Sequence, residues 1–147
     1  MRTEEEAVGS WTELDANYPP GALTPATALV VALGHLDGAS SVYTDGRPAP
    51  FLPVGLGYDT DLLGRAERYL GEVTLDQFLV EAVALLSARQ KLVVALQLLD
   101  RQFASGDPPE RRALLYRLVA GIGVGANTLT AHRATLALKN QLELFPQ

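Results

Sequence analysis

Helix-start signals recur through the second half of this chain, and they limit its possible folds more than any other feature. Thr74 and Gln77 stand three residues apart, as Ser87 and Gln90 do. This is the spacing of a capping box, in which two side chains satisfy each other's backbone N–H groups at the start of a helix. Because apolar residues recur at helical spacing behind both boxes, we divide residues 75–104 into two helices near Ser87; one long helix is the alternative.

Four further segments carry the signals that begin or end helices. They begin near Thr24, Asp59, Asp107 and Thr128. Thr24 and Asp107 each precede proline, so both are expected to be N-caps. The segment from Asp59 is expected to end at Gly71, because glycine commonly terminates helices. The sequence therefore predicts an all-α fold, a compact bundle of about six helices.

Residues 38–58 interrupt the helical pattern. They contain three prolines and four glycines, which prevent a long helix, yet they carry more apolar side chains than a flexible linker. The Asp45-Gly46 pair suits a two-residue turn and predicts a small hairpin at 42–48. We expect the rest of this Pro/Gly-rich loop to be ordered, with exposed apolar side chains that mark a partner site. The predicted partner-binding patch consists of Phe51, Leu52 and Leu56.

Composition and the N-terminal residues indicate how the chain is divided into domains and where in the cell it is located. Residues 1–23 end in a turn sequence and are interpreted as an N-terminal arm, and residues 24–147 as a single helical domain. The chain has no cysteine, which excludes disulfides and thiolate chemistry. No stretch reaches the roughly 18 apolar residues of a membrane span, and the acidic start is unlike a signal peptide. We therefore expect a cytoplasmic protein without a membrane span.

Charge is distributed unevenly along the sequence. Residues 1–86 carry four Lys or Arg against thirteen Asp or Glu, a net −9, whereas residues 87–147 carry eight against four, a net +4. The basic half makes nucleic-acid binding one alternative function. Its candidate contacts are Arg111, Arg112, Arg117, Arg133 and Lys139. Because these residues are spread over several helices without interleaved aromatic residues, nucleic acid is the less favoured partner.

No group of residues has the make-up of a catalytic site. His35 and His132 are the only histidines in the sequence, and neither has an acid placed to face it on the same helix. The helix dipole alone explains a cationic His35 at a helix end. The glycines at 121–125 follow a predicted helix, not a strand, and this context differs from that of a phosphate-binding loop. We therefore predict a protein that is not an enzyme.

Acidic residues flank two of the predicted turns. They are Asp37, Asp100, Asp107 and Glu110. Oxygen ligands in a glycine-containing turn suit a hard cation such as Ca²⁺, so these four residues are the candidate metal ligands. Their spacing is not that of an EF-hand loop, and helix capping is the alternative role for Asp107 and Glu110.

The segment from about Thr74 to Gln141 resembles the TerB-like helical family, whose namesake belongs to tellurite-resistance gene clusters. The matching pattern is LDQFLVEAVALL, RQKLVVALQLLDRQF, the turn ASGDPPE and RRALLYRLVAGIGV. LVVALGHLDG at 29–38 and LVVALQLLDR at 92–101 share LVVAL and, two residues later, a Leu-Asp pair, which suggests an internal duplication.

The TerB-like resemblance implies a non-enzymatic stress-response or accessory protein that acts through a protein partner or through self-association. It also implies a candidate Ca²⁺ site at the acidic turns, formed by Asp37, Asp100, Asp107 and Glu110. Two alternatives stay open beside it. The first is a small-ligand or divalent-metal-binding protein with loop 38–58 as the lid of its pocket, and the second is nucleic-acid binding.

Overall fold

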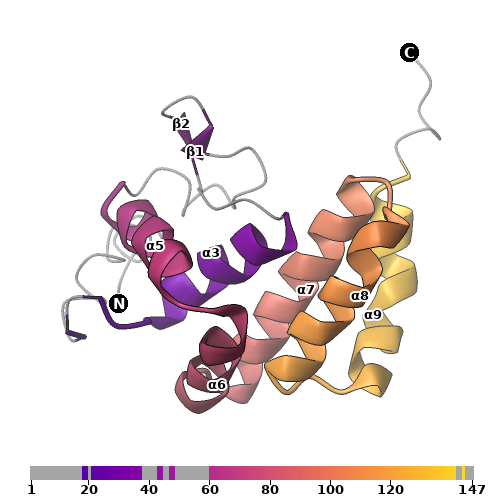
Figure 1. The fold of residues 1–147 in the computed structure, drawn as a ribbon. Helices are drawn as coiled ribbons and strands as arrows, with labels where there is room; N and C mark the ends of the chain where they lie inside the picture. The colour runs from indigo at the N-terminus through magenta and orange to yellow at the C-terminus, as the bar shows by residue number, and fades with distance from the viewer. Residues whose placement is uncertain are drawn as a thin grey trace, which may run out of the picture. The chain divides into compact units, whose positions relative to one another are not determined.

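The computed structural model describes residues 18–19, 21–37, 43–44, 47–48, 60–141 and 144. In these ranges it contains six α-helices, so the all-α prediction is confirmed (Figure 1). The helices are α3 (Pro25–Leu36), α5 (Thr60–Glu72), α6 (Leu75–Leu85), α7 (Ala88–Ala104), α8 (Pro109–Gly121) and α9 (Ala126–Lys139). The chain divides into two compact parts, an N-terminal unit (Met1–Leu85) and a C-terminal unit (Leu86–Gln147). None of the described helices is long and apolar enough to cross a membrane.

Helix α3 forms the core of the N-terminal unit. Thr24 is its N-cap, as predicted: the Thr24 hydroxyl accepts from the Thr27 N–H at 3.2 Å, and the Thr27 hydroxyl accepts from the Thr24 N–H at 2.8 Å. The helix is apolar on all sides, and most of its residues are buried. A helix of this kind belongs in an interior, and α3 packs against both α5 and α6.

Gly34 permits the close approach of α3 and α5. A Cβ atom at this position would lie 2.7 Å from Cδ1 of Leu70, closer than side chains pack. On α5, Leu62, Leu63 and Ala66 are buried at spacings of three and four residues, which is the pattern of one helix face. Gly71 lies inside α5, because the helix continues to Glu72; the prediction that it stops the helix was wrong.

Phe78 on α6 anchors an aromatic cluster in the N-terminal unit. Its side chain is fully buried, with ring centroids 5.5 Å from His35 on α3 and 6.2 Å from Tyr69 on α5. The Tyr69 hydroxyl donates a hydrogen bond to Glu81. Burial, together with the hydrogen bond and charge of Glu81, raises the pKa of Tyr69 far above its usual value. The cluster therefore joins one ring from each of the three helices α3, α5 and α6.

His35 is a neutral member of this cluster. Its Nε2 atom is buried and has no hydrogen-bond partner among the described residues, and burial lowers the pKa of the imidazole. A buried site disfavours the charged form, and this outweighs the attraction of the helix C-terminus for a cation. The helix dipole would account for a cationic or dipolar His35, but the burial of the imidazole favours its neutral form.

Acidification is expected to destabilise the N-terminal unit through His35. Because the folded-state pKa lies below the ordinary value of 6.5, the unfolded chain takes up the proton first as the pH falls. Stability from the neutral imidazole is complete above about pH 6.5 and declines below it, until the pH passes the lowered folded-state pKa. His35→Phe should flatten this part of the melting-temperature profile between about pH 7.5 and about pH 5. Identical profiles for the two chains would show that another group is responsible.

A two-stranded ladder lies where the hairpin is predicted. Strand β1 (Tyr43–Thr44) pairs antiparallel with β2 (Arg47–Pro48), so that Tyr43 is opposite Pro48 and Thr44 is opposite Arg47. The rest of loop 38–58 lies outside the described residues, as does most of the predicted arm.

Helices α7, α8 and α9 build the C-terminal unit, in which α7 packs against both of the others. The capping box at the start of α7 is confirmed, with Ser87 and Gln90 bonded to each other's backbone N–H at 3.2 and 2.8 Å. The division near Ser87 is therefore correct. Helix α9 begins at Ala126, two residues before the predicted start. The buried apolar residues of this unit are Leu86, Val94, Ala95, Leu98, Leu99, Leu115, Leu118, Val119, Ile122 and Leu129.

Helix α7 ends in a Schellman turn that runs into α8. Gly106 and Asp107 have positive φ angles of 84° and 52°, and their N–H groups donate to the carbonyls of Phe103 and Gln102 at 3.0 and 2.9 Å. Glycine is favoured at the first of these left-handed positions. Helix α8 begins at Pro109 with Pro108 at the N-cap, without a side-chain cap. Asp107 is therefore not the N-cap that the sequence predicts.

The glycine-rich segment 121–125 ends α8 in the same way. Gly123 has a φ of 94°, its N–H donates to the carbonyl of Ala120 at 3.0 Å, and the Val124 N–H donates to Val119 at 3.1 Å. Ile122 is fully buried. Helix termination thus accounts for these glycines, and the turn brings Val124 back over the end of α8.

Candidate functional site

Asp100 joins the end of α9 to α7. Its carboxylate accepts from Lys139 Nζ at 2.7 Å and from Asn140 Nδ2 at 2.8 Å. Burial alone would raise the pKa of Asp100, but the hydrogen bonds and the charge of Lys139 outweigh it and lower the pKa. The side chain is thereby ionised and held by a cation.

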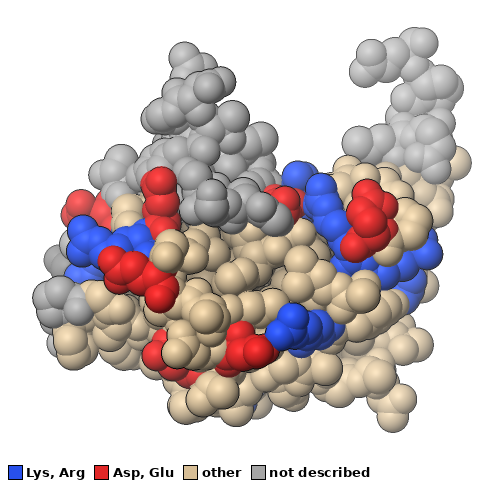
Figure 2. All heavy atoms as spheres, in the orientation of Figure 1, with Lys and Arg blue, Asp and Glu red and all other residues tan. Residues whose placement is uncertain are grey.

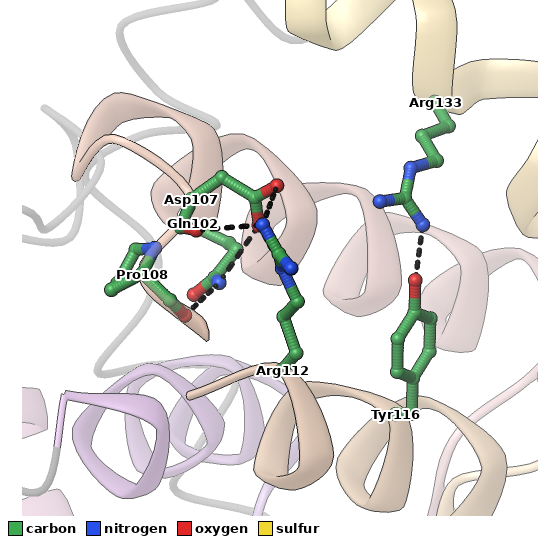
Figure 3. Close-up of polar contacts among 6 residues, drawn as sticks. All are labelled: Gln102, Asp107, Pro108, Arg112, Tyr116 and Arg133. Atoms are coloured by element: carbon green, nitrogen blue, oxygen red, sulfur yellow. Dashed lines mark hydrogen bonds and ion pairs between the residues drawn. The ribbon is translucent and has the colours of Figure 1, made fainter. Parts of the chain in front are cut away.

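Asp107 is held in a second cluster at the turn between α7 and α8 (Figure 3). Its oxygens accept from Gln102 Nε2 at 3.0 Å, and from Arg112 Nε at 3.3 Å and Nη2 at 3.1 Å. Gln102 is fully buried and also donates to the carbonyl of Pro108 at 2.9 Å. Burial raises the pKa of Asp107, but the hydrogen bonds from Arg112 and Gln102 and the charges of Arg112 and Arg133 lower it overall. Asp107 therefore fastens the turn to α8.

The four predicted metal ligands are divided between the two units. Asp37 belongs to the N-terminal unit, Glu110 is exposed in the first turn of α8, and Asp100 and Asp107 each contact a cationic side chain. Within the described ranges, no three His, Asp or Glu residues are grouped as metal ligands. Calcium binding stays a prediction from the sequence. The predicted partner patch of Phe51, Leu52 and Leu56 lies outside the described residues.

An apolar groove opens between α8 and α9 in the C-terminal unit. Its volume is about 250 Å³, and its lining residues are Tyr116, Val119, Ala120, Val124, Ala126, Leu129, Thr130 and Arg133. Val119 and Leu129 form buried walls, with 3% and 5% of their surface exposed, while Tyr116 stands 41% exposed. The small side chains of Ala120 and Ala126 leave space between the helices. The Thr130 hydroxyl donates to the Ala126 carbonyl at 2.9 Å, which leaves the groove walls mainly apolar.

Arg133 supplies the charge at this groove, and three helices position it. Its guanidinium carbon lies 5.8 Å from the ring centroid of Phe103 on α7 and 6.0 Å from that of Tyr116 on α8. Its Nη1 donates to the Tyr116 hydroxyl (Figure 3). Arg133 forms no ion pair with any described residue. An arginine remains protonated at physiological pH, so this group is suited to bind an anion but not to transfer a proton.

The basic side chains of the C-terminal unit do not form a separate stripe on the face seen in Figure 2. Acidic side chains lie among the basic ones where α7 and α8 are located. This mixture agrees with the pairing of Arg112 with Asp107 and of Lys139 with Asp100. Interspersed charges favour nucleic-acid backbones less than a basic surface would.

Sequence reasoning missed Gln102 and Tyr116. Gln102 follows Leu98 and Leu99 at the spacing of a buried helix face. A polar residue at this position was therefore the available signal for a buried side chain that forms hydrogen bonds. Tyr116 gives no such local signal, because its partner Arg133 is 17 residues away.

Comparison of the chain with protein-family models, curated proteins and solved structures finds no match. The TerB-like resemblance therefore stays a prediction from the sequence. The α8–α9 groove and its guanidinium provide the structural basis for a functional proposal.

Proposed function

We propose that this chain is a non-enzymatic helical interaction module. In this proposal the C-terminal unit binds an acidic, apolar segment of a partner protein in the groove between α8 and α9. One observation carries it: an open apolar groove whose guanidinium has no carboxylate partner among the described residues.

The apolar walls support the docking of a partner side chain. Val119 and Leu129 form buried walls of the groove, and the exposed side chain of Tyr116 also lines it. Tyrosine presents a large, stiff surface at low entropic cost, which suits it to protein interfaces. A groove between two helices is a common binding site for an amphipathic segment of a partner.

Charge supports an acidic partner. The C-terminal unit has eight Lys or Arg against four Asp or Glu, a net +4. Opposite net charge steers two proteins together and raises the association rate. By the same argument, residues 1–86, whose net charge is −9, would repel an acidic segment.

A stress-response or accessory role in the cytoplasm belongs to this proposal. Its support is the resemblance of residues 74–141 to the TerB-like family, which implies action through a protein partner or self-association. A docking groove in the same segment is compatible with that role.

Filling the groove is expected to abolish peptide binding. We would titrate the ¹⁵N-labelled chain with two helical peptides that share a leucine face, one with glutamate and one with lysine on the polar face. The glutamate peptide should shift the amide signals of Val119, Val124 and Leu129 more strongly, and Ala120→Phe should remove this response because the new ring occupies the groove.

The matched control is Ala131→Phe, on an exposed part of α9 that does not line the groove. It should bind the glutamate peptide as the unchanged chain does. Equal loss of binding in both variants, or no response of the groove amides to either peptide, would count against the groove as the docking site.

A further inference from the structure

We infer that Arg133 recognises a carboxylate side chain of the partner, next to the apolar group that fills the groove. This inference rests on the proposed function and adds to it the chemical group that decides specificity. It also assigns the contact with the carboxylate to Arg133 and not to the other arginines of the unit, an assignment that the net charge alone cannot make.

The rings of Phe103 and Tyr116 hold the guanidinium in place. Both ring centroids lie within 6.0 Å of its central carbon, which is the range of cation–π attraction. Side-chain ordering is a cost of binding, and a guanidinium already held over two rings has less freedom left to lose. The guanidinium of Arg133 is therefore preorganised for binding an anion.

The donors of Arg133 are only partly used. A guanidinium carries five N–H donors in a planar fork, and the hydrogen bond that Arg133 makes within the described residues goes to the Tyr116 hydroxyl. A carboxylate accepts two parallel N–H bonds from such a fork, and these charge-assisted bonds are stronger than neutral ones. The open donors therefore match a carboxylate in both charge and shape.

Asp107 forms its ion pair with Arg112 and not with Arg133. Asp107 feels the charge of Arg133, which contributes to its lowered pKa, but its oxygens are engaged by Gln102 and Arg112 (Figure 3). Arg112 thus satisfies the internal carboxylate. This pairing leaves Arg133 for a carboxylate from outside the chain.

The inference is tested with two small probes that differ only in charge. 3-Phenylpropanoate and 3-phenylpropanamide each carry a ring for the groove, and each is titrated into the ¹⁵N-labelled full chain. Both should shift the amides of Val119, Val124 and Leu129, and the carboxylate should bind about tenfold more tightly, as one added charge-assisted hydrogen bond would give.

Variants assign the preference to one residue. Arg133→Gln should bind both probes with the affinity of the amide, and Arg133→Lys should recover part of the difference, because lysine keeps the charge but loses the planar fork. Arg117→Gln, on α8 but outside the groove lining, should keep the full tenfold preference. Circular dichroism of each variant establishes that the helices are intact.

The outcomes separate the two proposals. Equal binding of both probes to the unchanged chain, or a preference that survives in Arg133→Gln, would overturn the role of Arg133 while the groove stands. Failure of both probes to shift the groove amides would overturn the groove as a binding site, and the proposed function with it.

Discussion

Phe78→Ala is expected to lower the free energy of unfolding of the N-terminal unit by about 3–5 kcal/mol. The phenyl ring is fully buried and meets His35 and Tyr69 from two other helices, so its removal leaves a cavity that no single helix can close. Losses of this size approach the total stability of many domains, about 5–15 kcal/mol. Urea titration followed by circular dichroism measures the loss. Amide hydrogen exchange shows whether α3, α5 and α6 lose protection together.

Val80→Ala is the matched control for this experiment. Val80 lies on the same helix, two residues along the chain, but is 73% exposed. Its truncation should change stability by no more than about 0.5 kcal/mol, as expected for a surface site. If the two variants lost similar stability, the helix itself and not the aromatic cluster would be the sensitive element.

Gln102→Leu is expected to destabilise the C-terminal unit by about 2 kcal/mol. Leucine has a similar size, but it cannot donate to Asp107 Oδ1 or to the Pro108 carbonyl, which Gln102 Nε2 reaches at 3.0 and 2.9 Å. Each acceptor left without its donor carries a cost. Gln102 Oε1 is buried and has no hydrogen-bond partner in the described part of the chain, so the removal of this oxygen offsets part of that cost. Urea titration and exchange of the amides at the α7–α8 turn measure the effect.

Gln97→Leu provides the comparison on the same helix. Gln97 is half-buried and lies more than one turn before the α7–α8 connection. This variant should unfold at nearly the same urea concentration as the unchanged chain. A Gln102→Leu chain that is as stable as Gln97→Leu would show that the two hydrogen bonds contribute nothing net.

Local sequence patterns predicted the helices well because their signals are local. The capping residues Thr24, Thr74 and Ser87 each bond to a backbone N–H three residues away, so both partners lie within one short stretch of sequence. The same patterns failed at Gly71 because glycine lowers helix stability by only about 1 kcal/mol. Packing of the neighbouring α5 residues on α3 easily exceeds such a preference.

The α7–α8 turn shows a second limit of sequence reasoning. Aspartate is a common N-cap residue, and Asp107 precedes two prolines as such a cap would. Its backbone, however, adopts a left-handed conformation, and its carboxylate contacts Gln102 and Arg112. These contacts form only once α7 and α8 are placed beside each other. A capping pattern cannot report them.

The candidate site depends on longer-range contacts. Phe103, Tyr116 and Arg133 come from three different helices. The sequence did flag Arg133, as one of several basic residues, but nothing in its neighbourhood distinguishes it from Arg117. Its two aromatic neighbours distinguish it, and they are visible only in three dimensions. His35 follows the same rule, since its pKa is lowered by burial and a residue distant in sequence, Phe78, packs beside its ring.

The position of Tyr116 has a practical consequence for following this molecule in solution. The sequence has five tyrosines, and Tyr116 is the single one within Leu86–Gln147. Its hydroxyl contacts the guanidinium at the edge of the groove. Incorporation of 3-fluorotyrosine would therefore place one ¹⁹F nucleus in the C-terminal unit, next to the cation. Substitution of Tyr116 by phenylalanine would identify its resonance, which then reports directly on occupancy of the groove.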